Sequence, residues 1–519
     1  MRSEPTTRGS EVLGARPQRV RPVALATVAS VVGADAVEGD VTVSGVTLRS
    51  QSVRPDDLYA ALPGARTHGA RYAADAADRG AVAFLTDPTG AGTCRETGRP
   101  VLVVEGPRDR LGEVASVVYG SPSDRIATLG VTGTQGKTTV TFLTEAGLRG
   151  VGATAAVVGT TGTRIAGRPV KSTLTTPEAP DLHALLAVMV EQGVDACAME
   201  VSSHALIQGR VDGVVFDVAT FLNLGRDHLD FHGDMASYFE AKAALFTPER
   251  ARRAVVDIDD DYGRRLVERL EIPYSTLSTD GADADWRAER IEATAQGTAF
   301  DVIAPDGGRH DVRLPLVGTF NVANALAALA SLVAVGYPID AVIQGLADCP
   351  SVPGRMESVD AGQSFAAIVD YAHKPDALRA VLTSLRPLTT GRILLVIGAG
   401  GDRDAGKRPL MGEVAAAFAD VVVVTDDNPR TETPAAIRSE VLAGARASGS
   451  STELVEIGDR RKAIRLAVSS AHDGDCVVVA GKGHETGQEI DGVVHPFDDV
   501  VELRAALEER LGPDAESES

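Results

Sequence analysis

Residues 130–139, Gly-Val-Thr-Gly-Thr-Gln-Gly-Lys-Thr-Thr, combine glycines, a lysine and threonines in a spacing suited to holding phosphate. A short apolar run precedes them and a helix is expected from Lys137, so backbone N–H groups and the positive helix end would surround an anion. Lys137 would contact the β- and γ-phosphates of a nucleotide, and Thr138 would hold Mg²⁺. The standard loop has glycine at the position of Val131. The alternative is a glycine turn with a surface lysine, but the order of strand, loop and helix favours the nucleotide site.

Polar side chains also follow other apolar runs that are typical of buried parallel strands. Glu200 ends one such run, and His228 follows the next, which we expect to be its neighbour in the sheet. A carboxylate and an imidazole can share a hard cation that also carries phosphate oxygens. A helix cap at Glu200 and a hydrogen-bonded loop histidine remain alternatives. Lys242 falls in a helical pattern, and its spacing alone predicts a solvated lysine.

Three motifs in the last third of the chain also follow buried runs. In Asp-Asn-Pro-Arg, 427–430, the arginine could bind a carboxylate through two parallel hydrogen bonds; the alternative is an Asn-Pro turn. The Gly-rich, basic stretch 400–409 is either a ligand loop or a charged loop. The stretch 480–485, Ala-Gly-Lys-Gly-His-Glu, is either an anion-binding nest or a tight turn.

Between the buried runs lie amphipathic helical patterns, one with Leu182, Leu185, Leu186 and Met189 on one face. Alternating strands and helices predict an α/β fold with doubly wound sheets. In such sheets ligands bind beyond the carboxyl ends of the strands, which is where the motifs stand. Changes in composition predict the following segments: a mobile tail 1–22, domains 23–123, 124–350 and 351–512, and an acidic tail 513–519.

The apolar run after Arg21 has the flanks of a secretory signal, but we interpret it as the first helix of a folded domain. No stretch approaches the roughly 20 apolar residues of a membrane span. The net charge of −21 and an aromatic content of 4% argue against nucleic-acid binding, which needs surplus cations and stacking platforms. No pair of cysteines has metal-site spacing, so we expect free buried thiols at the following positions: Cys94, Cys197, Cys349 and Cys476.

Taken together, the motifs resemble those of the Mur ligases of peptidoglycan synthesis. In chain order they are GTQGKTT, TTPEA, EVSSHAL, NLGRDHLDFH, GTFNVANALAA, PGRME, DYAHKPDAL, GGDRDAGKRPLM, DNPR and AGKGHE. The resemblance covers nearly the whole chain and explains the altered loop, because this family uses G-T-x-G-K-[ST]. It implies three α/β domains: a uridine-nucleotide domain, a central P-loop-type parallel sheet that binds ATP, and a C-terminal Rossmann-like domain for the amino acid.

The resemblance implies a cytoplasmic, monomeric, ATP- and Mg²⁺-dependent ligase. Its substrates would be UDP-N-acetylmuramoyl-L-alanyl-D-glutamate and meso-2,6-diaminopimelate. The D-glutamate γ-carboxylate would attack the γ-phosphate of ATP, and the amine of diaminopimelate would then displace phosphate from the acyl phosphate. A lysine-adding relative, and a nucleotide-dependent scaffold without catalysis, are the alternatives. ATP and amino-acid residues fall in different expected domains, so residues 349–355 are expected to act as a hinge.

The family's functional residues carry over to matching positions of this chain. The residues implied in catalysis and metal binding are Lys137, Thr138, Glu200, His228 and a carbamylated Lys242. Those implied to bind ATP are Gly133, Thr134, Gln135, Gly136, Lys137, Thr138, Thr139, Asn321, Arg355, Asp370 and Tyr371. Those implied for the UDP-muramoyl dipeptide are Leu48, Ser50, Thr175, Thr176, Ser202, Gln208 and Arg210. Those implied for diaminopimelate are Arg403, Asp427, Asn428, Pro429, Arg430, Gly481 and Glu485.

Two positions depart from the family pattern. Leu48-Arg49-Ser50 stands where the family has Asp-Ser-Arg, and Leu174 replaces an asparagine before the two threonines. The choice of amino acid follows from charge, because diaminopimelate carries one more carboxylate than lysine and Arg430 can pair with it. A hydrogen bond to a charged group is worth about 1.5–3 kcal/mol, which is enough to select between the two.

Overall fold

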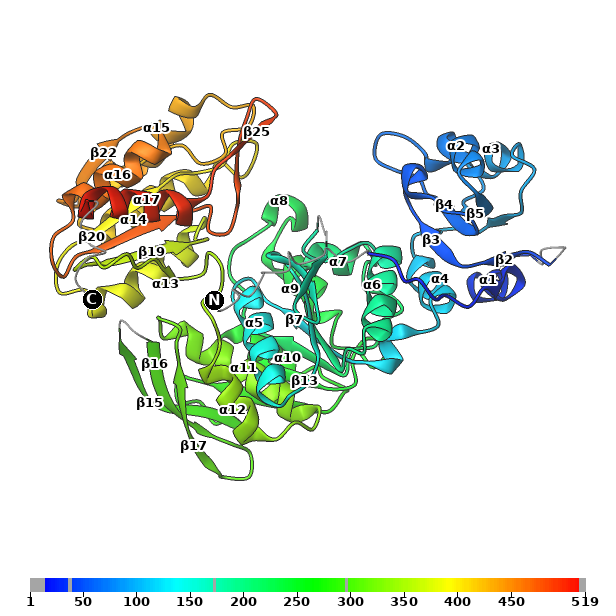
Figure 1. The fold of residues 1–519 in the computed structure, drawn as a ribbon, viewed down its shortest axis with the longest axis horizontal. Helices are drawn as coiled ribbons and strands as arrows, with labels where there is room; N and C mark the ends of the chain where they lie inside the picture. The colour runs from blue at the N-terminus through cyan, green and yellow to red at the C-terminus, as the bar shows by residue number, and fades with distance from the viewer. Residues whose placement is uncertain (1–14, 36–39, 171–173, 295–296, 513–519) are drawn as a thin grey trace, which may run out of the picture. The chain divides into compact units, whose positions relative to one another are not determined.

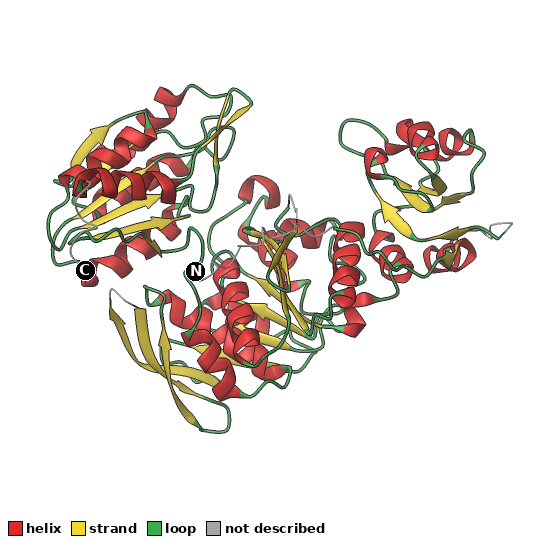
Figure 2. Ribbon diagram, viewed as in Figure 1, coloured by secondary structure: helices red, strands yellow, loops and turns green. Residues whose placement is uncertain are grey.

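The computed structural model describes residues 15–35, 40–170, 174–294 and 297–512 (Figure 1). The chain divides into two compact units. Unit 1 consists of residues 1–224, 232–277 and 327–345, and unit 2 of residues 225–231, 278–326 and 346–519. Both units combine strands with flanking helices, as Figure 2 shows.

The N-terminal part of unit 1 is a parallel sheet of four strands in the order β3-β4-β5-β6. Its strands and main helices are β3 (Gly45–Thr47), β4 (Asp57–Ala61), β5 (Ala81–Thr86), β6 (Val101–Val103), α1 (Leu25–Val32), α2 (Ala73–Asp78), α3 (Ala91–Arg95) and α4 (Leu111–Val118). The run after Arg21 does form a helix, α1, whose Leu25 and Val28 are buried in this core. The end of the expected tail is anchored, since Arg16 Nη1 lies 2.7 Å from Asp57 Oδ2.

The rest of unit 1 is built on a larger sheet with the strand order β10-β9-β8-β11-β7-β12-β13-β14. Its strands are β7 (Ala127–Thr132), β8 (Ala155–Gly159), β9 (Gly162–Ile165), β10 (Arg168–Val170), β11 (Ala196–Glu200), β12 (Val218–Phe221), β13 (Ala254–Asp257) and β14 (Tyr274–Ser278). The helices are α5 (Lys137–Gly150), α6 (Ala179–Glu191), α7 (Ser203–Ile207), α9 (Met235–Ala243) and α10 (Asp261–Val267). In this set β9 alone runs in the opposite direction, because it pairs antiparallel with both β8 and β10.

One expected pairing was wrong. β11, which ends at Glu200, and β12, which precedes His228, are not neighbours, because β7 lies between them and pairs with both. Glu200 is therefore level with Val131 and reaches the end of the phosphate-loop strand directly. The helix predicted from Leu182 to Met189 is α6, and its four marker residues are all buried.

Unit 2 contains an antiparallel ribbon and a second α/β sheet. The ribbon strands are β15 (Trp286–Thr294), β16 (Gly297–Ile303) and β17 (Arg309–Leu314). The sheet has the order β18-β19-β23-β20-β21-β22, with strands β18 (Glu357–Ser358), β19 (Ala366–Asp370), β20 (Ile393–Ile397), β21 (Val421–Val424), β22 (Glu453–Glu456) and β23 (Cys476–Ala480). Its helices are α13 (Pro375–Leu385), α14 (Lys407–Phe418), α15 (Pro434–Ala447), α16 (Arg460–Ser470) and α17 (Asp499–Leu511). The hairpin β24 (Gly487–Ile490) and β25 (Val493–Pro496) follows β23, while α8 (Leu229–His232), α11 (Phe320–Ala334) and α12 (Ile339–Ala347) lie where the units divide the chain.

The C-terminal sheet is covered on both faces. Successive residues of β20 point to opposite faces, as strand geometry requires. Leu395 packs with Met411 of α14 and Ile437 of α15, whereas Leu394 packs with Ile464 of α16. Two separate cores therefore sandwich the strands, which is the doubly wound arrangement that the near-continuous apolar runs predicted.

Parallel pairing places four strand ends at one edge of this sheet. Asp370 and Ile397 both lie level with Ala480, and Ile397 lies level with Val424. The loops after β19, β20, β21 and β23 therefore leave the sheet side by side. All four cysteines are buried free thiols, as expected. No helix in the described ranges has both the length and the apolar character needed to cross a bilayer.

Candidate active site

The phosphate loop of unit 1 joins β7 to α5. Lys137 is the first residue of α5, and Gly136 before it has φ +86°, a left-handed conformation that favours glycine. The Lys137 Nζ donates to the carbonyl oxygens of Gly133 (2.7 Å) and Thr134 (3.2 Å). The Lys137 side chain therefore folds back onto the loop that precedes it.

Asn223, which follows β12, braces this loop. Its Oδ1 accepts from the Gln135 backbone N–H at 2.9 Å, and its carbonyl accepts from the Thr134 N–H at 3.0 Å. The motif search did not single out Asn223, although it opens the quoted NLGRDHLDFH stretch. Only the adjacency of β12 to β7 reveals its role.

Glu200 and Thr138 meet beside the loop. The Thr138 hydroxyl donates to Glu200 Oε1 at 2.9 Å, and both side chains are buried. The Thr160 backbone N–H also donates to Oε1, at 2.8 Å. Gly159 allows this approach, because a Cβ there would lie 2.5 Å from Glu200 Oε1. A carboxylate and a hydroxyl at the mouth of a phosphate loop are the hard oxygen donors that Mg²⁺ prefers.

Lys242 is buried, so the expectation of a solvated lysine was wrong. It is 1% exposed, because α9 packs its Tyr238 and Phe239 into the core of unit 1. The Lys242 Nζ donates to Gly133 O at 2.9 Å and lies 4.8 Å from the centre of the Tyr238 ring. The side chain therefore ends at the carbonyl that Lys137 also contacts. Helical spacing could not reveal this, since nothing in the local pattern shows which face of α9 is covered.

A cluster of polar groups surrounds the carboxyl end of β11. The Thr176 hydroxyl donates to Glu200 O at 2.8 Å and accepts from the Ser202 N–H at 3.2 Å. Arg210 donates to Thr176 O at 3.2 Å and to Gln208 Oε1 at 2.6 Å. The Thr175 hydroxyl lies 3.2 Å from that of Thr160. Five of the seven residues expected to bind the muramoyl dipeptide thus lie around one strand end.

The other two expected residues, Leu48 and Ser50, belong to the N-terminal sheet. Leu48 packs partly buried against the core of that sheet. Ser50 is buried and begins the short 3₁₀ helix η1 (Ser50–Ser52). Both follow the carboxyl end of β3, the edge at which ligands bind in parallel sheets.

The ATP-binding residues expected in unit 2 come from α11, from the segment before β18 and from the end of β19. Asn321 lies in the first turn of α11 and donates to Val317 O at 2.8 Å. Asp370 ends β19, and burial raises the pKa of its carboxyl. The Arg355 guanidinium lies 4.6 Å from the centre of the Tyr371 ring, and burial raises the pKa of Tyr371 to about 12.

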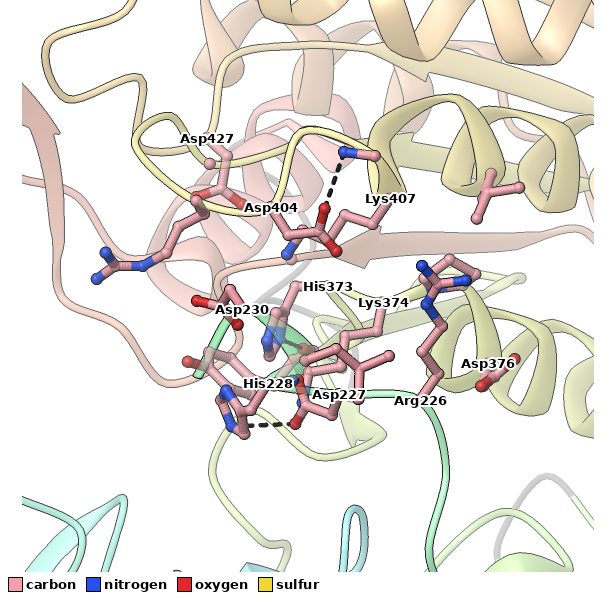
Figure 3. A pocket seen from close by; sticks show the side chains of 18 of the residues that line it. Arg226, Asp227, His228, Asp230, His373, Lys374, Asp376, Asp404, Lys407 and Asp427 are labelled. Carbon is pink, nitrogen blue, oxygen red and sulfur yellow. Dashed lines mark hydrogen bonds and ion pairs between the residues drawn. The ribbon is translucent and has the colours of Figure 1, made fainter. Parts of the chain in front are cut away.

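A pocket of about 470 Å³ opens at the carboxyl edge of the C-terminal sheet (Figure 3). It is lined by the loops after β19, β20, β21 and β23 together with residues 226–230, all within unit 2. Six of the seven residues expected to bind diaminopimelate line it: Arg403, Asp427, Asn428, Arg430, Gly481 and Glu485. Pro429, the seventh, is buried between two of them.

Arg430 lines this pocket, and three hydrogen bonds fix its backbone and its guanidinium group. Its backbone has φ +52°, and its N–H donates to Glu489 O at 3.0 Å. Its Nη1 donates to Gly401 O at 2.6 Å, and its Nε donates to Glu489 Oε2 at 3.2 Å. These bonds connect the DNPR loop, the Gly-rich loop and β24, so three distant segments set the position of one cation.

The pocket also contains cations that the sequence did not single out. Lys374 pairs with Asp227, which also contacts His228 Nε2 at 3.1 Å (Figure 3). Burial, and then the charge of Lys374, lower the pKa of Lys407. Burial also lowers the pKa of His373 well below its usual value. His373 and Lys374 fall inside the quoted DYAHKPDAL stretch, which was the one available signal.

Comparison with known proteins shows the family. The profile of the Mur ligase catalytic domain matches residues 42–119, that of the middle domain 131–332, and that of the glutamate ligase domain 354–483. A ligase of Streptomyces avermitilis named UDP-N-acetylmuramoyl-L-alanyl-D-glutamate–2,6-diaminopimelate ligase is 53% identical over 96% of this chain and 99% of its own. A Streptomyces coelicolor protein of the same name is 50% identical, over 96% and 99%.

Comparison with solved structures leads to the same family. A diaminopimelate ligase structure, at 33% identity and a TM-score of 0.67, covers 95% of this chain and 100% of its own. Sheets, phosphate loop and pocket together define an ATP-dependent ligase of three α/β domains. The chain belongs to the Mur ligase family. Each profile match falls inside one of the three expected domains, whose exact boundaries stay a prediction.

Proposed function

We propose that this chain is the ligase that adds meso-2,6-diaminopimelate to UDP-N-acetylmuramoyl-L-alanyl-D-glutamate in peptidoglycan precursor synthesis. The observation that carries the proposal is the pocket of unit 2, which brings Arg430 and Asn428 of the loop after β21 together with Glu485 of the loop after β23. A cation and an amide suit a carboxylate, while Glu485 suits an ammonium. Diaminopimelate offers both groups at its distal end.

The reaction requires two anions to meet. The γ-carboxylate of D-glutamate attacks the γ-phosphorus of ATP, ADP leaves, and an acyl phosphate remains. The amine of the amino acid then attacks the acyl carbon, phosphate leaves with the bonding electrons, and the amine loses a proton as the amide forms. Lys137 and the backbone N–H groups of the phosphate loop hold the transferring phosphate and offset its charge.

Thr138 and Glu200 would hold one Mg²⁺ ion, which supplies further positive charge to the transferring phosphate when it is bound. Their oxygens already lie 2.9 Å apart, and the donor chemistry fits a hard cation. Within the part of the chain that the structure describes, no three His, Cys, Asp or Glu side chains form a group able to hold a metal. Phosphate oxygens would complete the coordination, with Glu200, His228 and Lys242 supporting a second ion.

Lys242 serves that role only as a carbamate. A bare ammonium repels a cation, whereas reaction with carbon dioxide makes the side chain anionic. Its Nζ ends 2.9 Å from Gly133 O, beside the phosphate loop. Removing bicarbonate from the assay is expected to lower the activity, and restoring it is expected to recover the rate.

The muramoyl dipeptide would bind along the polar cluster at the end of β11, through Thr175, Thr176, Ser202, Gln208 and Arg210. Leu48 and Ser50 would contact the uridine part. The enzyme acts in the cytoplasm as a monomer, and residues 349–355 serve as a hinge between ATP and amino-acid domains. Equal scattering profiles with and without substrates would contradict the hinge.

The test is ADP and phosphate release by the purified chain with each substrate omitted in turn. The proposal expects release only with ATP, Mg²⁺, the UDP-dipeptide and diaminopimelate together, and a product heavier by one diaminopimelate residue. L-Lysine in place of diaminopimelate is expected to be used at least about tenfold less efficiently, because Arg430 then has no ligand carboxylate to bind. Equal use of both would instead favour a lysine-adding enzyme, and no release at all would favour a scaffold.

A further inference from the structure

Lys482 is buried directly behind the amino-acid pocket. It follows Gly481 in the loop after β23, and its side chain is 0% exposed. Its Nζ donates to Asn428 Oδ1 at 3.0 Å and to Glu485 Oε2 at 3.2 Å, and lies 3.8 Å from Asp427 Oδ1. All three partners line the pocket, whereas Lys482 does not. A fully buried ammonium is costly unless it is paired, so its position calls for an explanation.

The contacts of Lys482 determine which way the Asn428 amide faces. Asn428 Oδ1 accepts from two groups that can only donate, the Lys482 ammonium and the Glu489 backbone N–H at 2.9 Å. Asn428 Nδ2 donates to Glu485 Oε2 at 2.8 Å. With its oxygen occupied twice, Asn428 can offer a ligand only the remaining hydrogen of Nδ2. Such a donor accepts a carboxylate and rejects an ammonium.

Lys482 also balances charge. Its ammonium lies 3.2 Å from Glu485 Oε2 and 3.8 Å from Asp427 Oδ1, so it is shared between two carboxylates of the pocket. One lysine offsets one of the two charges and leaves a single negative charge for the ammonium group of a ligand. Without it, the surplus negative charge would repel the carboxylate that Arg430 is placed to bind.

We propose that Lys482 is a positioning residue for amino-acid selection: it orients the Asn428 amide, and offsets one acidic charge, so that the pocket takes a carboxylate and an ammonium side by side. This inference rests on the proposed function. It predicts that Lys482 affects the Michaelis constant for diaminopimelate and leaves those for ATP and the UDP-dipeptide unchanged.

The first test is steady-state kinetics of Lys482→Met, which keeps most of the side-chain volume and removes the charge. We expect the KM for diaminopimelate to rise about 10- to 100-fold, the range for loss of a charged hydrogen bond, with the KM for ATP within about twofold. Lys482→Arg, which keeps the charge and the donors, should recover part of the loss. Lys462→Met is the matched control, because Lys462 is 74% exposed on α16.

A double-mutant cycle with Asn428→Ala tests the route of the effect. If Lys482 acts in part through the amide, Lys482→Met should raise the KM less in an Asn428→Ala background than in the parent enzyme, and the rise that remains reports the charge effect. Fully additive losses would overturn the proposal, as would an unchanged KM for diaminopimelate. A parallel rise in all three Michaelis constants would indicate a merely structural lysine and would overturn it too.

If Lys482→Met does not fold, Asn428→Asp tests whether the orientation of the amide selects the ligand. Aspartate presents only acceptors to the pocket and can keep its bond to Lys482, so the KM for diaminopimelate should again rise about 10- to 100-fold. An unchanged KM would contradict the orientation argument. Failure of the parent enzyme to use diaminopimelate would instead refute the proposed function, so the two failures are distinguishable.

Discussion

The phosphate loop of unit 1 and the amino-acid pocket of unit 2 hold charged groups in different ways. The loop is one contiguous stretch, Gly133–Thr139, whose donors are mostly backbone N–H groups at a helix start. The pocket is assembled from side chains of four loops, and these are held from behind by buried charges such as Lys482. A backbone cradle tolerates most side-chain changes within it. A side-chain constellation depends on each member and on the residues beneath it.

Replacing Lys137, the cationic side chain of the phosphate loop, should give the largest loss of activity. Lys137→Ala removes the cation at the transferring phosphate and is expected to lower kcat by about 10³- to 10⁵-fold, the range for loss of such a cation in phosphoryl transfer. ADP formation with saturating substrates is the measurement. Lys462→Ala, a change at an exposed lysine, is the control. Ligation at the native rate without Lys137 would refute the role of the loop.

Removing a buried charge beneath the amino-acid pocket should lower the free energy of unfolding of unit 2. Arg460 and Asp499 form a fully buried ion pair, and Arg460 also donates to Ala480 O at 3.0 Å, just before the pocket loop. Asp499→Ala leaves the guanidinium unpaired and should lower the unfolding free energy by about 3–5 kcal/mol.

The measurement is denaturant-induced unfolding of the full chain. The free energy of unfolding is taken from the transition in which unit 2 unfolds. Glu502→Ala breaks the neighbouring pair with the half-exposed Arg461 and should cost less than about 1 kcal/mol. Equal losses in the two variants would mean that the buried pair does not hold this edge of the sheet.

A single pocket side chain should matter for one substrate only. Arg430→Ala is expected to lower kcat/KM for diaminopimelate by about 10- to 150-fold, because a charge-assisted hydrogen bond is lost. The KM for ATP should stay within about twofold, and Arg446→Ala at an exposed position of α15 is the control. A matching loss with L-lysine as substrate would show that Arg430 does not read the distal carboxylate.

The smallest effect is expected inside the phosphate loop. Gln135→Ala leaves the backbone N–H that donates to Asn223 Oδ1 in place, so the KM for ATP should change by no more than about twofold. Isothermal titration with ADP provides a second measurement. A tenfold loss would mean that the Gln135 side chain, rather than its backbone, takes part in binding.

The two sites were also unequally predictable. The phosphate loop was found from a contiguous pattern, since the glycines, lysine and threonines that bind phosphate are adjacent in sequence. In the pocket, the motif alone indicated that Arg430 could bind a carboxylate, with an Asn-Pro turn as the alternative, and the diaminopimelate role of Arg430 and Glu485 came only from the family resemblance. Lys482, Lys374 and Lys407 were not assigned at all, because their surroundings come from segments far apart in the chain.

Local sequence patterns failed most often to predict which polar side chains are buried. Lys242 lies in a helix whose sequence shows no obvious buried face, yet it is 1% exposed. The position of β7 between β11 and β12 could not be read from the order of the strands either. The apolar run of each strand predicts that the strand is buried, but it does not predict which strand pairs with it.

From its sequence alone this chain determines alternating strands and helices, a phosphate-binding turn and the apolar runs of its sheets, because these depend on periodicity and backbone conformation over a few residues. Only the tertiary structure decides that Glu200 meets Thr138 and that Lys482 orients Asn428. Those contacts depend on strand order and on which charges share a buried space. A buried charge is tolerated only where distant parts of the chain bring it a partner.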